Sequence, residues 1–154
     1  FARLNRQAIA ADIIRSMKFT QLTSFSTVHN YIDAENKILR KGAISAQDGE
    51  RMMIPLNMRD GCLICRGKGN TDWNCSAPHG AGRAFNRTDT VNAFTLSQYK
   101  REMQGIYSTS ISRDTLDECP MAYKDSSIIM EQINPTVEVI EKLTPVYNFK
   151  AGAR

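Results

Sequence analysis

The chain has 154 residues and a formal net charge of +4, with 42% hydrophobic and 23% charged residues. Its length fits a single domain with one core, and its composition is that of an ordinary globular protein. No apolar run approaches the roughly 20 residues of a membrane span and no secretory signal is visible, so we expect a cytoplasmic protein without a membrane partner. The mild positive charge is compatible with an anionic partner.

The first 18 residues have the pattern of an amphipathic helix. Ile9, Ile13 and Met17 recur at helical spacing and predict a face that packs on the core. No capping residue precedes this helix, so we expect the chain to be a processed product or a piece of a longer protein. Residues 25–32 then predict a β-branched and aromatic strand that runs into His29 and Asn30. His29 is either a hydrogen-bonded core histidine or a metal ligand.

The middle of the chain alternates strands and turns. Residues 38–44 contain Arg40 and Lys41 beside a glycine, which indicates either a solvated strand end or a clamp for polynucleotide phosphates. Residues 52–58 predict a strand that breaks at its proline, and residues 62–65 predict the next strand after a turn. The Cys-x-x-Cys pair in that second strand points to opposite faces and has no histidine pair, which argues against zinc.

A histidine followed by small residues and an arginine occupies residues 76–83, with the sequence Ser-Ala-Pro-His-Gly-Ala-Gly-Arg. The backbone of Gly80, Ala81 and Gly82 can approach an anion closely, and Arg83 carries a guanidinium that matches phosphate geometry. A ring nitrogen of His79 could attack phosphorus or bind a metal. A glycine turn after an ordinary histidine is the alternative interpretation.

The last third predicts short elements. Thr95 and Gln98 form a capping-box pattern at the start of a helix that ends near Gly105. We expect a strand over 106–112, a loop over 114–124, a helix over 126–133, a second helix from Asn134 with Val137, Ile140 and Leu143 inward, and a final strand over 145–150. Without a regular βαβ rhythm, the order of elements favours an α+β fold of mixed strands and short helices.

Taken together, these pieces resemble the RtcB family of RNA-splicing ligases. The resemblance spans nearly the whole chain and rests on residues 2–6, 29–30, 40–43, 54–58, 76–83, 117–123 and 149–150, in the family's order. It implies that residues 1–154 are the C-terminal portion of an RtcB-like ligase domain. The family joins RNA ends that carry a 3′-phosphate or 2′,3′-cyclic phosphate to 5′-hydroxyl ends, with GTP and manganese, as in tRNA splicing and RNA repair.

The resemblance also implies roles for particular residues. His79 would be the guanylylated histidine, His29 a manganese ligand, and Arg40, Lys41 and Arg83 candidates for RNA phosphates. The nucleotide would be held by Asn30, Pro55, Leu56, Asn57, Met58, Cys62, Gly80, Ala81, Gly82, Tyr123 and Lys150. Three positions depart from the family pattern: Leu56 and Asn57 stand where many members have Gly-Ser, and Cys62 stands where a serine is usual.

The family's other manganese ligands lie in an N-terminal half that this sequence does not contain. We therefore expect an incomplete metal site and little ligase activity from the chain alone. The implied partners are the RNA ends, the N-terminal half and an archease-type activator. A non-catalytic RNA- or nucleotide-binding remnant, or a plain structural domain, are the alternatives.

Overall fold

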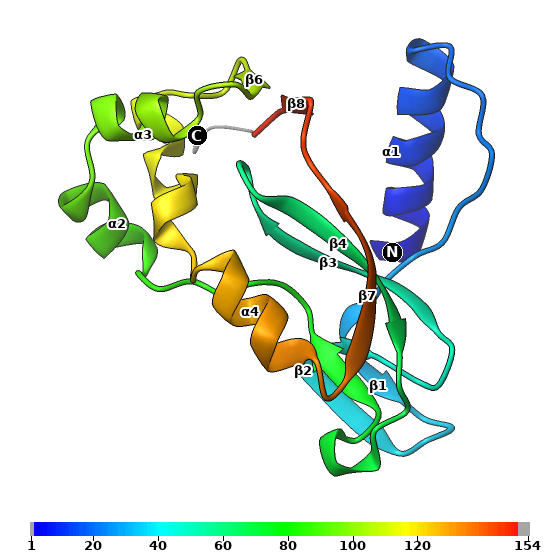
Figure 1. The fold of residues 1–154 in the computed structure, drawn as a ribbon. Coiled ribbons are helices and arrows are strands. Elements are labelled where there is room, and N and C mark those ends of the chain that lie inside the picture. The colour runs from blue at the N-terminus through cyan, green and yellow to red at the C-terminus, as the bar shows by residue number, and fades with distance from the viewer. Residues whose placement is uncertain (1, 151–154) are drawn as a thin grey trace.

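The computed structural model describes residues 2–150, and the side chains from residue 4 onward. Helices and short antiparallel sheets confirm the α+β prediction (Figure 1). The helices are α1 (Ala2–Ser16), α2 (Arg87–Ala93), α3 (Leu96–Glu102) and α4 (Ser126–Ile133), with 3-10 turns at Thr71–Trp73, Arg113–Glu118 and Pro120–Ala122. The strands are β1 (His29–Asp33), β2 (Ile38–Ser45), β3 (Arg51–Asn57), β4 (Gly61–Gly67), β5 (Ser76–Pro78), β6 (Tyr107–Ser108), β7 (Val137–Leu143) and β8 (Tyr147–Asn148).

Two three-stranded sheets carry the fold, and both are antiparallel. One has the order β1-β2-β5 and the other β3-β4-β7, while β6 and β8 form a short parallel pair. In Figure 1, α4 lies across the middle of the molecule, α2 and α3 lie together on one side of it, and α1 stands on the other. None of the described helices is long and apolar enough to cross a membrane.

Two clusters of buried side chains form the core. The larger joins β2, β3, β4 and β5 to α4 and the start of β7, and includes Ile44, Ile54, Leu63, Ile133 and Val137. The smaller lies between α3 and the two later 3-10 turns and comprises Met58, Tyr99, Met103, Leu116, Cys119 and Ala122. The β3–β4 hairpin contributes to both clusters, because Leu56 belongs to the first and Met58 to the second.

The predicted core face of the first helix is wrong for the described residues. Ile9, Ile13 and Met17 are 53%, 51% and 60% exposed and belong to neither buried cluster. Figure 1 shows the reason, because α1 projects beside the body instead of packing across a sheet. The helical pattern is therefore correct and the predicted burial is not.

The predicted helix from Asn134 is also wrong. Asn134 has helical backbone angles and is the C-cap of α4, and the chain then enters β7, which pairs antiparallel with β4. Lys68 and Asn70 donate side-chain hydrogen bonds to the carbonyl oxygens of Asn134 and Pro135, at 2.6 and 3.0 Å. These contacts direct the turn into a strand, which β-branched Val137, Val139 and Ile140 favour.

Smaller corrections concern strand and loop boundaries. Strand β3 continues through Pro55, which pairs with Cys62, because an edge strand tolerates the missing N–H.

Helix α2 was not predicted, although the Asn86 side chain caps it by accepting from Asp89 N–H. The predicted loop over 114–124 contains two 3-10 turns, and the strands predicted over 25–32, 106–112 and 145–150 shorten to β1, β6 and β8. The Thr95–Gln98 capping box and the helix over 126–133 are confirmed.

Candidate active site

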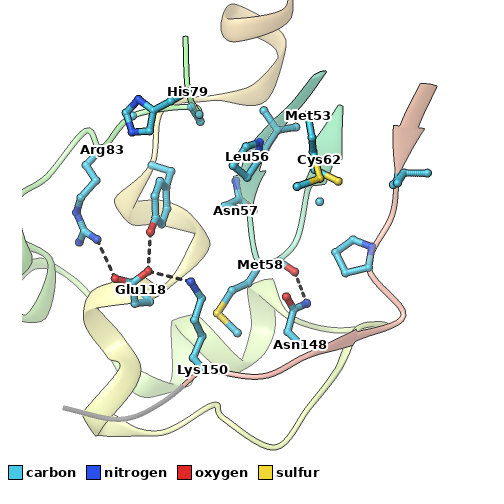
Figure 2. A pocket seen from close by; sticks show the side chains of 18 of the residues that line it. Met53, Leu56, Asn57, Met58, Cys62, His79, Arg83, Glu118, Asn148 and Lys150 are labelled. Carbon is cyan, nitrogen blue, oxygen red and sulfur yellow. Dashed lines mark hydrogen bonds and ion pairs between the residues drawn. The ribbon is translucent and has the colours of Figure 1, made fainter. Parts of the chain in front are cut away.

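A cavity of about 770 Å³ opens at the end of the β3–β4 hairpin, within the range of small-molecule sites (Figure 2). The 3-10 turns and the C-terminal segment complete its wall. Among its lining residues are these sequence-predicted positions: Pro55, Leu56, Asn57, Met58, Cys62, His79, Gly80, Ala81, Gly82, Arg83, Tyr123 and Lys150. His29, Asn30, Arg40 and Lys41 do not line it.

His79 lies at the mouth of the cavity, directly after β5, with its side chain exposed. Its Nδ1 is 2.6 Å from the carbonyl oxygen of Gly42 in β2. A carbonyl oxygen can only accept, so Nδ1 carries the proton of the neutral ring. The lone pair of the neutral ring is then on Nε2, where it is available to attack an electrophile.

His29, at the start of β1, stacks on His79. The ring centroids are 5.0 Å apart and the planes are inclined by 12°. His29 therefore lies beside His79, although it does not line the cavity. Among residues 2–150, no group of three or more His, Cys, Asp or Glu side chains is arranged to hold a metal ion.

The Gly80–Gly82 loop is held against β3 by backbone contacts. Ala81 N–H donates to the carbonyl oxygen of Pro55 at 3.1 Å, and a Cβ at Gly80 would lie 3.1 Å from the same oxygen. Gly82 has φ +71°, which favours glycine. Only two of the three backbone N–H groups predicted to meet an anion remain for it, because the N–H of Ala81 already donates to Pro55. The N–H groups of Gly80 and Gly82 make no hydrogen bond to the described residues.

The β3–β4 residues form the floor of the cavity. Leu56 and Met58 are almost fully buried, and the Met58 sulfur accepts from Tyr99 Oη at 3.0 Å. Asn57 Oδ1 accepts from the N–H groups of Arg59 and Asp60, so this side chain stabilises the hairpin turn. Burial raises the pKa of the Cys62 thiol, which keeps it neutral at pH 7.

Glu118 lines the cavity but is not among the site residues predicted from the sequence, and the same holds for Arg87 and Asn148. Four polar side chains converge on the Glu118 carboxylate: Tyr123 Oη at 2.6 Å, Arg87 at 3.1 Å, Lys150 Nζ at 3.3 Å and Arg83 at 3.5 Å. Figure 2 shows Arg83 and Lys150 on either side of Glu118. Burial opposes ionisation of Glu118, but the hydrogen bond from Tyr123 and the charge of Lys150 outweigh it and hold the pKa below its usual value. Burial, and next the hydrogen bond to Glu118, raise the pKa of Tyr123 to about 12. The signal of Glu118 in the sequence is its place within residues 117–123, one of the stretches that carry the family resemblance.

Arg83 is held in place from several directions. Its guanidinium donates to the carbonyl oxygens of Phe85 and Asp117 and to Thr90 Oγ1, and lies 5.2 Å from the centroid of the Tyr123 ring. The side chain is 24% exposed, at the cavity wall. It can therefore meet an anion in the cavity only as a fixed charge and not as a mobile arm.

The expectation that Arg40 meets RNA phosphates is corrected by its burial. Arg40 is 2% exposed, and its guanidinium donates to Asp33 at 2.8 Å, to Tyr31 and Ser76, and to two backbone carbonyl oxygens. A side chain so enclosed ties β1, β2 and β5 together and has no surface for RNA. The adjacent Lys41 is exposed, as strand alternation requires.

The sequence is similar to known proteins over nearly its whole length. The protein-family model described as tRNA-splicing ligase RtcB matches residues 1–151. RNA-splicing ligase RtcB of Escherichia coli strain K12 is 33% identical over 163 residues, which cover 95% of this chain and 40% of that protein. The tRNA-splicing ligase RtcB of Aeropyrum pernix is 38% identical over 82 residues, which cover 50% of this chain and 17% of that protein. The chain therefore spans less than half the length of these curated relatives.

Proposed function

The chain belongs to the RtcB family of tRNA-splicing ligases, and on this premise we propose that it supplies the histidine-bearing part of a GTP- and manganese-dependent RNA ligase. The substrates are an RNA end with a 3′-phosphate or 2′,3′-cyclic phosphate and an RNA end with a 5′-hydroxyl. In this proposal the remaining part of the ligase, with further metal ligands, has to accompany residues 1–154, and an archease-type protein is a candidate activator.

The proposed reaction begins at His79. Its Nε2 lone pair attacks the α-phosphorus of GTP, a phosphorus–nitrogen bond forms, and pyrophosphate leaves with the electrons of the broken phosphorus–oxygen bond. A 2′,3′-cyclic phosphate is first opened by water to a 3′-phosphate. An oxygen of the 3′-phosphate then takes the GMP group as the phosphorus–nitrogen bond to His79 breaks. The 5′-hydroxyl oxygen finally attacks the 3′-phosphorus, loses its proton and displaces GMP to form the phosphodiester. The single observation that carries the proposal is the 2.6 Å contact of His79 Nδ1 with Gly42 O, which leaves Nε2 as the nucleophile at the cavity mouth.

The cavity suits a nucleotide in its chemistry. Its floor is apolar, and its far side carries Tyr123, Glu118 and Lys150, which can hydrogen-bond a base edge. The N–H groups of Gly80 and Gly82 directly follow His79 in the chain and would meet the phosphates. The guanidinium of Arg83 also contacts Glu118, at 3.5 Å, and would lie between the phosphates and the base. We assign the guanine to the Glu118 side and the phosphates to the loop side.

Manganese fits only in part. We propose His29 as one ligand, and its position beside His79 supports this, but residues 2–150 do not assemble a complete set. A bound manganese ion would polarise the phosphoryl oxygens and steady the leaving pyrophosphate. Three roles of the chain's own residues do not depend on the manganese ion. His79 attacks, the Gly42 carbonyl accepts the Nδ1 proton in a hydrogen bond, and Arg83 offers positive charge.

RNA ligation by the full-length protein tests this proposal. The substrates are one RNA with a 3′-phosphate and another with a 5′-hydroxyl, supplied with manganese and either GTP or ATP. We expect joining with GTP, loss of joining in His79→Gln, and no joining with ATP. GTP binding without any joining by a folded, manganese-loaded protein would contradict the ligase proposal and favour the alternative, a nucleotide-binding remnant.

A further inference from the structure

The β1–β2 hairpin contains an irregularity opposite the candidate nucleophile. His29 pairs with Ile44 but Tyr31 pairs with Arg40, so Asn30 alone faces the three residues Lys41, Gly42 and Ala43. Asn30 has φ +57° and Gly42 has φ +67°, both in the left-handed region. Asparagine tolerates that region better than most residues, and glycine adopts it without strain. The bulge therefore depends on the residue types at both positions.

Asn30 and His79 bind Gly42 from opposite sides. Gly42 N–H donates to Asn30 Oδ1 at 2.6 Å, and Gly42 O accepts from His79 Nδ1 at 2.6 Å and from His79 N–H at 3.4 Å. A Cβ at Gly42 would lie 3.6 Å from the His79 ring, which is an ordinary contact. The left-handed backbone, and not a lack of space, is thus what favours glycine here.

The direction of the Gly42 carbonyl decides which nitrogen of His79 is free. The carbonyl belongs to the peptide that follows Gly42, and its direction follows from the backbone angles of this flexible residue. Asn30 Oδ1 restrains those angles by holding the Gly42 N–H. If the carbonyl turns away, Nδ1 loses its acceptor and the neutral ring can carry its proton on Nε2, where the lone pair is needed.

We propose that Asn30 is a positioning residue that, through Gly42, fixes His79 in the Nδ1–H tautomer with Nε2 ready for attack. This inference rests on the proposed function for the use that it gives to Nε2. It differs from the nucleotide contact that the resemblance implies for Asn30, for which the amide nitrogen is left once Oδ1 is engaged. The oxygen serves Gly42, and the nitrogen makes no hydrogen bond with the described residues.

Two substitutions separate the two uses of the amide. Asn30→Asp keeps an oxygen that can accept from Gly42 N–H and removes the amide donor. Asn30→Gly keeps the left-handed backbone and removes both. If Asn30 positions His79, the tautomer survives in the aspartate variant and is lost in the glycine variant. A nucleotide contact alone would leave the tautomer of His79 unchanged in both variants.

The test is ¹⁵N NMR of the full-length protein labelled at histidine, at a pH where the ring is neutral and without nucleotide or metal. Loss of a signal in His79→Gln assigns the ring. We expect the Nδ1–H tautomer in wild type and Asn30→Asp, and a mixture of tautomers in Asn30→Gly with at least a tenfold loss of guanylylation rate at saturating GTP. Near-ultraviolet circular dichroism checks the fold of each variant.

Three results distinguish failure of the positioning proposal from failure of the proposed function. An Nε2–H tautomer in the wild-type protein overturns the proposal before any variant is needed. A pure Nδ1–H tautomer in folded Asn30→Gly also overturns it, because Gly42 would then hold its direction unaided. Wild-type protein with the expected tautomer but no guanylylation would contradict the proposed function and leave the positioning of the ring intact.

Discussion

The imidazole of His29 stacks on that of His79, with ring centroids 5.0 Å apart and planes 12° from parallel. Stacking alone and metal binding predict different outcomes for two substitutions. His29→Phe keeps a flat ring beside His79, whereas His29→Ala removes it. If His29 is a manganese ligand, both variants weaken manganese binding by about tenfold or more. Isothermal titration with manganese measures this, and wild-type affinity in His29→Phe would reduce His29 to a packing role.

Glu118 is predicted to hold the base-recognising end of the cavity together. Glu118→Gln keeps an acceptor for Tyr123 Oη but removes the charge that attracts Lys150 and Arg83. We expect GTP to bind about tenfold more weakly, which corresponds to about 1.4 kcal/mol. Glu131→Gln on the exposed side of α4 is the matched control. Unchanged GTP affinity in a folded Glu118→Gln protein would remove Glu118 from the site.

Substitutions of the neighbouring residues Arg40 and Lys41 are expected to change the free energy of unfolding by very different amounts. Arg40→Ala leaves Asp33 and two backbone carbonyl oxygens without their buried partner, so we expect a loss of about 3 kcal/mol or more in unfolding free energy. Lys41→Ala changes stability by less than about 0.5 kcal/mol, because the side chain is exposed. Urea unfolding of both variants measures the difference. Weaker RNA binding at low salt in Lys41→Ala would support Lys41 as a phosphate contact, and unchanged binding would contradict that role.

The Asp33–Arg40 pair also predicts a pH dependence. The hydrogen bond from Arg40 and those from Asn36 lower the pKa of Asp33 from 3.8 to about 2. A lowered pKa means that the unfolded chain binds the proton more readily, so this pair stabilises the protein above about pH 4 and loses its effect as pH falls toward about 2. The difference in unfolding free energy between wild type and Asp33→Asn therefore shrinks over that window. A difference that stays constant from pH 6 to pH 2.5 would contradict the assignment.

Two isoleucines test where the core lies. Ile54 in β3 is fully buried in the larger cluster, and Ile13 in α1 is 51% exposed. We expect Ile54→Ala to lower the unfolding free energy by about 2–4 kcal/mol. Ile13→Ser is expected to change it by less than about 0.5 kcal/mol. Equal losses in the two variants, measured by thermal or denaturant unfolding, would mean that α1 packs on the core after all.

The sequence predicted the elements whose signals are local. The Thr95–Gln98 capping box is such a case, since cap and partner are three residues apart. The role of Asn134 was predicted wrongly because asparagine can cap either end of a helix. Which end it caps depends on distant contacts: Lys68 donates to Asn134 and Asn70 donates to Pro135, each across more than 60 residues of sequence. The helical periodicity of Ile9, Ile13 and Met17 showed an apolar face without showing whether anything covers it.

Many of the site residues predicted from the motifs line one cavity, but the contacts that these residues make could not be predicted from the sequence. The carbonyl of Gly42 lies 37 residues before His79, and no spacing rule predicts that the two meet. Arg40 was misjudged because a basic residue in a strand is normally solvated, and its buried partners come from β1 and from the residues before β5. The role of Glu118 could not be predicted because it depends on four side chains, Tyr123, Arg87, Lys150 and Arg83, that the fold brings to its carboxylate.

The most direct test of the central claim is intact-mass and peptide analysis after incubation with GTP and manganese. Residues 1–154 are incubated alone and in the full-length protein. The account predicts a GMP adduct on His79 in the full-length protein, absent in His79→Gln and absent from residues 1–154 alone. A GMP adduct on another residue, or none in a folded protein that binds manganese and GTP, would contradict the claim that His79 is the nucleophile.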